Sequence, residues 1–184
     1  MSDNKASRSK VPIIDKFERD ETGSIVINMT VKNDDGFLSP YSTGSTPVIS
    51  SEVAEFIENS TLFLPPRARL VLRIHSDCID GNEQQIYREA VKEYFAQRHS
   101  ALCKERRFNL VAVIALAIAG ITTLALSFLI DNVIWAEVVD IVAWVLLWEA
   151  TDIGIFKSRS QTRDLGRYLA LSSMKVDYRP TEDR

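Results

Sequence analysis

Residues 108–156 constrain the fold of this chain more than any other stretch, because these 49 positions include no lysine and no arginine. The first run, Phe108 to Ile130, spans 23 residues without a charged side chain, and a second apolar run extends from Val133 to Phe156. Crossing a hydrocarbon core of about 30 Å takes roughly 20 helical residues. Soluble helices of this length normally keep a polar face. The stretch therefore predicts a transmembrane hairpin with spans at 108–130 and 133–156.

Basic residues on either side of the two spans predict the orientation of the hairpin. The connector has none, whereas both flanks carry several: Lys104, Arg106, Arg107, Lys157, Arg159, Arg163 and Arg167. The positive-inside rule then places both termini in the cytoplasm and the connector outside. The first ten residues are polar and no apolar run follows them, so no cleavable signal peptide is expected. We expect an integral protein of a plasma or inner membrane.

The residues before the hairpin predict a cytosolic α+β domain at 21–107, preceded by a flexible tail of residues 1–20. Two segments, 24–32 and 68–75, alternate apolar and polar side chains as half-buried strands do. Between them, Ser50 or Ser51 is expected to cap a short helix.

A long helix is predicted to join this domain to the first span. No proline or glycine lies between Asn82 and Ala119, so one helix can run from Glu83 to Ile130. A break between Arg98 and Lys104 is the alternative. The cytosolic basic tail, 157–184, includes a strand pattern at 174–178, which either pairs with the N-terminal sheet or remains an edge segment for a partner.

The second span contains four carboxylates, and these are the main candidate site residues: Glu137, Asp140, Glu149 and Asp152. A charge at the centre of a membrane helix costs about 2.5–3.5 kcal/mol. Hydrogen-bond or charge partners are therefore expected, and an antiparallel hairpin offers three at the cytosolic end of the first span: Arg106, Arg107 and Asn109. The alternatives are a ring of carboxylates that favours cations in an oligomer and a site for a ligand or lipid headgroup.

Small side chains in the first span predict close helix packing, within the chain or between chains. These residues are Ala112, Ala115, Ala119, Gly120, Thr123 and Ser127.

Catalytic and metal-binding patterns are weak. His75-x-x-Cys78 and His99-x-x-x-Cys103 resemble the halves of a zinc site, but a continuous helix between them would separate the pairs by about 30 Å. We expect no metal, no cofactor and no enzyme active site. The formal net charge of −3 argues against a nucleic-acid-binding protein.

The sequence thus predicts a two-span membrane protein that self-assembles and whose cytosolic domain is a docking or sensing module. The expected partners are the lipid bilayer, further copies of the chain, and an unidentified cytosolic protein or small ligand. The alternative is a small cation-permeable pore or membrane-perturbing effector gated by the cytosolic domain.

Overall fold

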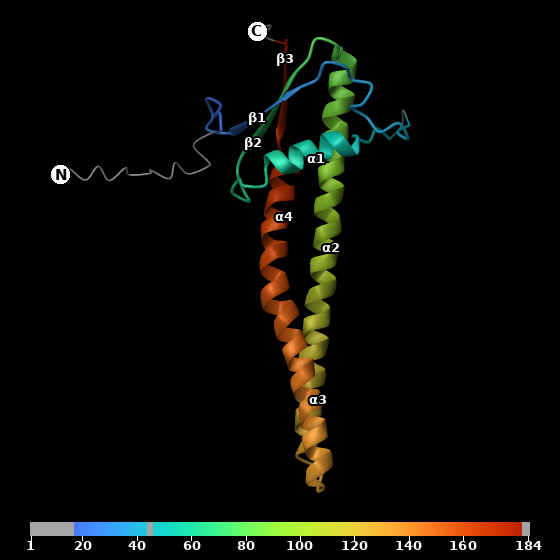
Figure 1. Ribbon diagram of the computed structural model, residues 1–184, viewed down its shortest axis with the longest axis vertical. Coiled ribbons are helices and arrows are strands. Elements are labelled where there is room, and N and C mark those ends of the chain that lie inside the picture. The colour runs from blue at the N-terminus through green and yellow to red at the C-terminus, as the bar shows by residue number, and fades with distance from the viewer. Residues whose placement is uncertain (1–16, 44–45, 182–184) are drawn as a thin grey trace, which may run out of the picture. The chain divides into compact units, whose positions relative to one another are not determined.

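The computed structural model describes residues 17–43 and 46–181, which form three strands and a set of helices (Figure 1). In chain order these elements are β1 (Ile25–Thr30), α1 (Ser51–Ser60), β2 (Leu70–His75), α2 (Gly81–Ser127), α3 (Val133–Thr151), the π-helix η2 (Asp152–Lys157), α4 (Ser158–Ser172) and β3 (Lys175–Arg179). The chain divides into two compact units. The first contains the described residues up to Phe95 and those from Ala170 onward, and the second is Ala96–Leu169. The predicted mixture of helices with a small sheet is confirmed.

The three strands form one parallel sheet in the order β1-β2-β3. Leu72 in the central strand pairs with Ile27 of β1 and Val176 of β3, and all three side chains are buried. Parallel neighbours require long crossover connections rather than tight turns. Helix α1 lies in the β1–β2 connection, and all the residues from α2 to α4 lie in the β2–β3 connection. The strand at 174–178, whose pairing the sequence left open, is β3.

One face of the sheet forms the core of the first unit. Leu72 and Ile74 are fully buried, as are Ile57 of α1 and Val91 and Phe95 of α2. The spacing of Val91 and Phe95 places both on one side of α2, because residues four apart share a helix face. This side of α2 therefore contributes to the buried core of the first unit.

Capping residues decide where the helices begin. The Ser50 side chain accepts a hydrogen bond from the Val53 N–H at the start of α1. At the start of α2, Asp80 Oδ1 accepts from the Glu83 N–H at 2.9 Å, and Glu83 Oε2 accepts from the Asp80 N–H at 3.0 Å. This reciprocal pair is a capping box. It lets α2 begin at Gly81, two residues before the predicted start.

Helix α2 then continues without interruption for 47 residues, a length of about 70 Å at 1.5 Å per residue. The predicted uninterrupted helix is confirmed, although it ends at Ser127 rather than Ile130. Beyond it, hydrogen bonds from Leu129 N–H to Leu126 O and from Ile130 N–H to Ser127 O form a turn. Asn132 Oδ1 then accepts from the Ile134 and Trp135 N–H groups and starts α3.

Within the second unit, α2 and α3 pack against each other in opposite directions. Their contacts pair Ser127 with Asp140, Gly120 with Leu147, and Val113 with Gly154, so the later residues on one helix meet the earlier residues on the other. The helical run that contains α3 does not end at Phe156, where the second span was expected to end. It continues through η2 into α4 as far as Ser172.

Candidate functional site

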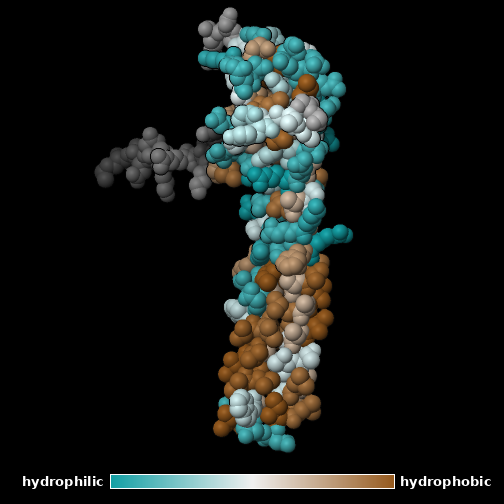
Figure 2. Space-filling model, turned by 90° about the vertical axis from the view of Figure 1, so that its right-hand side faces the viewer, coloured by the Kyte–Doolittle hydropathy of each residue, from teal (hydrophilic) through white to brown (hydrophobic). Residues whose placement is uncertain are grey.

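The surface of the second unit from Phe108 to Phe156 is largely apolar. Phe108 is 74% exposed, Trp148 73% and Phe156 68%, and many aliphatic side chains between them are exposed as well. In the lower part of Figure 2 this surface is mostly brown, with some white patches and teal atoms at its lower end. Large exposed apolar patches mark contact with a membrane or another protein.

One helix in the described part of the chain, α2, is long and apolar enough to cross a membrane by length and composition. Only 11% of its most apolar stretch is buried, whereas the core helix of a soluble protein would be mostly buried. Helix α3 has 19 residues and is apolar apart from Thr151 and three carboxylates, Glu137, Asp140 and Glu149.

The predicted small-residue stripe divides between the helix contact and the exposed surface. Gly120 and Ser127 are buried, and Ala112 and Thr123 are half-buried. Ala115 and Ala119 are exposed. The contact is closest at Gly120, where an added Cβ atom would lie 2.8 Å from Leu147 Cγ and 3.3 Å from the Ala143 carbonyl oxygen.

Asp140 is the one predicted carboxylate that turns toward this helix contact. Ser127 Oγ lies 2.9 Å from Asp140 Oδ1 and donates a hydrogen bond to it. The same hydroxyl group lies 2.8 Å from the Leu124 carbonyl oxygen at the end of α2. The structure therefore pairs Asp140 with Ser127, which the sequence had assigned only to helix packing.

The other three carboxylates, Glu137, Glu149 and Asp152, are exposed on the outside of the helix pair. The structure does not bring their expected partners to them. Among the described residues no ion pair joins Arg106 or Arg107 to any of these acids, and both arginines are exposed. The Asn109 Nδ2 atom is buried without a hydrogen-bond partner. The observed register explains this difference. Val113 contacts Gly154, so Asp152 lies about two residues beyond Val113, on the side away from Asn109. Asn109 and the two arginines therefore lie too far along α2 to reach it.

A different polar contact joins the helices next to the apolar surface. Glu105 Oε1 accepts a hydrogen bond from Gln161 Nε2 at 3.1 Å and lies 3.6 Å from Lys157 Nζ. Gln161 is buried. Sequence reasoning missed Glu105 because it lies inside a basic run. The available signal was an acidic residue among the cations before the first span, in a segment that an antiparallel hairpin places beside the cations after the second span.

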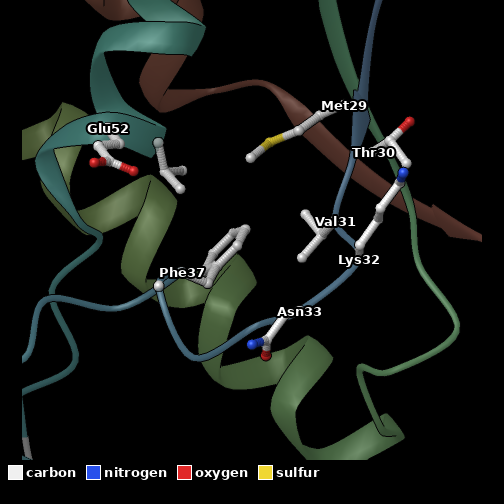
Figure 3. Close-up of a pocket in the computed structure, with 9 residues that line it drawn as sticks. Met29, Thr30, Val31, Lys32, Asn33, Phe37 and Glu52 are labelled. Atoms are coloured by element: carbon white, nitrogen blue, oxygen red, sulfur yellow. The ribbon is translucent and has the colours of Figure 1, made fainter.

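The first unit contains an open pocket of about 400 Å³ at the carboxyl end of β1. In Figure 3 the side chains of Met29, Val31 and Phe37 point into it, and Glu52 of α1 lies at its edge. Polar residues also line the pocket, among them Lys32 and Asn33, so its wall is partly apolar and partly polar.

The second face of the sheet carries polar side chains. Arg73 is buried, and its Nη1 atom lies 2.7 Å from Glu18 Oε1. Asn28 Nδ2 donates to Glu18 Oε2 at 2.9 Å. Both hydrogen bonds lower the pKa of Glu18, and the one from Asn28 has the larger effect. The carboxylate thus remains charged and compensates a guanidinium group that has little access to water.

Two of the cysteine and histidine residues adjoin these features: His75 Nε2 lies 3.3 Å from Asn28 Oδ1, and Cys78 Sγ lies 3.8 Å from the Val31 carbonyl oxygen. Cys78 and Cys103 are free thiols, and Cys103 Sγ lies 3.8 Å from His99 Nε2 on the next turn of α2. Within residues 17–43 and 46–181 no group of histidine, cysteine and acidic side chains could hold a metal ion.

Comparison with known proteins gives no match to a protein-family model, a curated protein or a solved structure.

Proposed function

We propose that this chain is a two-span integral membrane protein whose first unit is a docking or sensing module on the cytoplasmic side. The observation that supports this most directly is the apolar surface of the antiparallel pair α2 and α3, from Phe108 to Phe156. Exposing this surface to water would cost roughly 25 cal/mol for each Å². A bilayer removes that cost along the apolar part of both helices.

Cysteine accessibility tests both insertion and orientation. In a background of Cys78→Ser and Cys103→Ser, a cysteine at Asp131 in the connector is expected to react with a membrane-impermeant maleimide applied to intact cells. A cysteine at Ser160, an exposed position beyond the second span, is expected to react only after permeabilisation. Equal labelling of both sites in intact cells, together with release of the protein by alkaline carbonate, would contradict the proposal.

Self-association follows from the position of Glu149. This carboxylate is exposed on the apolar surface, eight residues from Lys157 and so about 12 Å from the end of the span. An isolated charge there costs about 2.5–3.5 kcal/mol, which a donor from a second copy would offset. Assembly of like chains is therefore part of the proposed function.

Glu149→Leu tests this assembly, because leucine needs no polar partner. We expect the variant to shift toward monomer in mild detergent, measured by light scattering during size exclusion. The control is Val145→Leu, which changes an exposed residue one turn away without removing a charge. An unchanged mass for Glu149→Leu would contradict assembly through this residue.

A cation-permeable assembly is the second candidate, and the outward exposure of Glu137, Glu149 and Asp152 favours it. If these acids line a path between copies, proteoliposomes will pass cations, and Glu149→Gln will reduce the flux while the oligomer persists. Absence of flux in an assembled protein would exclude the pore and leave the docking role.

The docking role is assigned to the pocket at the carboxyl end of β1. Its apolar floor suits an aliphatic or aromatic group of a partner. A photo-crosslinking residue in place of Glu52, at the pocket edge, is expected to capture a cytosolic partner. The same residue in place of Lys92, an exposed position on α2, is the control, and equal capture at both positions would contradict the assignment.

A further inference from the structure

Two basic segments that are distant in the sequence lie at one level of the second unit. Hydrogen bonding between Gln161 and Glu105, together with the ion pair between Lys157 and Glu105, links them across α2 and the η2–α4 run. The exposed cations at this level form what we call the basic band: Lys104, Arg106, Arg107, Lys157, Arg159 and Arg163.

Most of the positive charge in the basic band is uncompensated. Lys157 shares Glu105 with Gln161. In the part of the chain that the structure describes, no ion pair engages Arg106, Arg107, Arg159 or Arg163. Such a cluster attracts a polyanionic surface, and the position of the cluster in the molecule indicates which kind of polyanionic surface it binds.

The basic band directly adjoins the apolar surface on both helices. Arg107 precedes Phe108, and Lys157 follows Phe156, and both phenylalanines are largely exposed. From Phe156 the helical rise reaches Arg159 after about 5 Å and Arg163 after about 10 Å, and the polar headgroup layer on each side of a bilayer is roughly 5–8 Å thick. The cations therefore occupy the depth of the phosphate groups when the apolar surface occupies the hydrocarbon core.

We propose that the basic band binds anionic glycerophospholipids and enriches them around the cytoplasmic ends of the two spans. This inference rests on the proposed membrane insertion. Arginine donors match phosphate geometry in two-point hydrogen bonds, and each cation near an anionic membrane surface adds a favourable contribution. A nucleic acid or an acidic protein would bind the cations without covering the adjoining apolar surface at Phe108 and Phe156.

The three tryptophans of the chain provide the test, because brominated lipids quench tryptophan fluorescence on contact. The full chain is placed in vesicles that contain brominated phosphatidylglycerol or brominated phosphatidylcholine at equal fractions. One reporter variant keeps only Trp148, which lies about 13 Å from Lys157 and so at the depth of the brominated acyl chains, through Trp135→Phe and Trp144→Phe. A second keeps only Trp135, near the connector that lacks basic residues, through Trp144→Phe and Trp148→Phe.

We expect phosphatidylglycerol to quench Trp148 more than phosphatidylcholine does, by an enrichment of roughly two- to fivefold. Trp135 should show no preference. The preference should fall in about 0.5 M salt, where screening is strong. It should also fall in the variant Arg106→Gln, Arg107→Gln, Arg159→Gln and Arg163→Gln.

The charge-matched control changes four exposed cations outside the basic band, namely Lys32→Gln, Lys92→Gln, Lys175→Gln and Arg179→Gln, and should keep the preference. Equal quenching of Trp148 by both lipids would overturn the lipid inference and leave membrane insertion standing. Absence of quenching by either lipid would overturn membrane insertion as well.

Discussion

At the scale of single residues, the contact between α2 and α3 depends on the missing side chain at Gly120. A Cβ atom there would lie 2.8 Å from Leu147 Cγ and 2.9 Å from Leu147 Cδ2. Both distances are shorter than carbon atoms normally approach, and the Ala143 carbonyl oxygen, 3.3 Å from the same Cβ position, limits any adjustment. The helix pair therefore requires glycine at this position for packing.

Gly120→Val is expected to destabilise the pair by about 1–3 kcal/mol, the usual cost of overpacking. Denaturation of the detergent-solubilised protein, followed by far-ultraviolet circular dichroism, measures this loss. Ala119→Val is the matched control, because Ala119 is the exposed neighbour, and its stability should change by less than about 0.5 kcal/mol. Equal stability of the two variants would show that Gly120 does not lie at the helix contact. A reduced oligomer in Ala119→Val alone would assign the exposed small residues to contacts between chains.

Tyr178 gives the first unit a dependence on alkaline pH. Its hydroxyl group donates to the Gln84 carbonyl oxygen at 3.0 Å, and burial raises its pKa to about 12 while Arg88 opposes the shift. Burial also raises the pKa of Tyr87, whose hydroxyl group donates to Asp34. A pKa above the ordinary tyrosine value of about 10 means that the folded state favours the neutral phenol.

The first unit should therefore keep this stabilisation below about pH 10 and lose it as the pH rises through about 12. Melting temperatures of the full chain between these pH values measure the loss. Tyr178→Phe should flatten the decrease, since phenylalanine cannot ionise, whereas Tyr41→Phe, at an exposed position, should not. Parallel curves for Tyr178→Phe and the parent chain would contradict the assignment.

At the scale of the elements, η2 determines which side of α4 faces α2. In a π-helix each hydrogen bond joins residues five apart instead of four, so a turn contains about one residue more than a turn of α-helix. Single π turns occur mostly within longer α-helices. Here the wide turn spans Asp152–Lys157, between α3 and α4. It shifts the rotational position of the downstream residues, and Gln161 then faces Glu105.

Deleting Gly154 is expected to convert η2 into α-helix and to keep the rotation of α4 relative to α3, because a π-helical stretch holds about one residue more than the α-helix that replaces it. The contact between Gln161 and Glu105 should then persist. Cysteines at both positions, in the background of Cys78→Ser and Cys103→Ser, should form a disulfide in the parent chain and in this deletion variant. Deleting both Gly154 and Ile155 is the control, because the second deletion should turn α4 by about 100° and abolish the cross-link. Loss of cross-linking after deletion of Gly154 alone would show that η2 does not hold one extra residue.

At the scale of the whole molecule, the second unit is an insertion into a parallel sheet. Strands β2 and β3 pair directly, although α2, α3, η2 and α4 separate them in the sequence. The contacts that hold β3 belong to the first unit, where Leu171, Met174 and Val176 are buried. The first unit should therefore fold without the second.

Replacing Ala96–Leu169 with a flexible glycine-serine linker is expected to yield a domain that is soluble without detergent and melts cooperatively. Circular dichroism and size exclusion measure both properties. The same excision with Val176→Asp is the control, since a carboxylate at this buried strand position should prevent folding. A requirement for detergent in the excised chain would indicate that the second unit contributes to the core of the first.

The local pattern of the chain was sufficient for the long uninterrupted helix, the apolar stretch and three strands, predicted at 24–32, 68–75 and 174–178 and observed at 25–30, 70–75 and 175–179, because periodicity and capping act over a few residues. Three features depended on contacts between distant residues. The direction of β3 beside β2 depends on a crossover of about a hundred residues, and the pairing of Asp140 with Ser127 on the packing register of two helices. The level of the basic band depends on the contact of Glu105 with Gln161. A one-turn slide between two helices leaves every local pattern unchanged while it changes each polar partner, so only the packed structure decides which acids meet a donor.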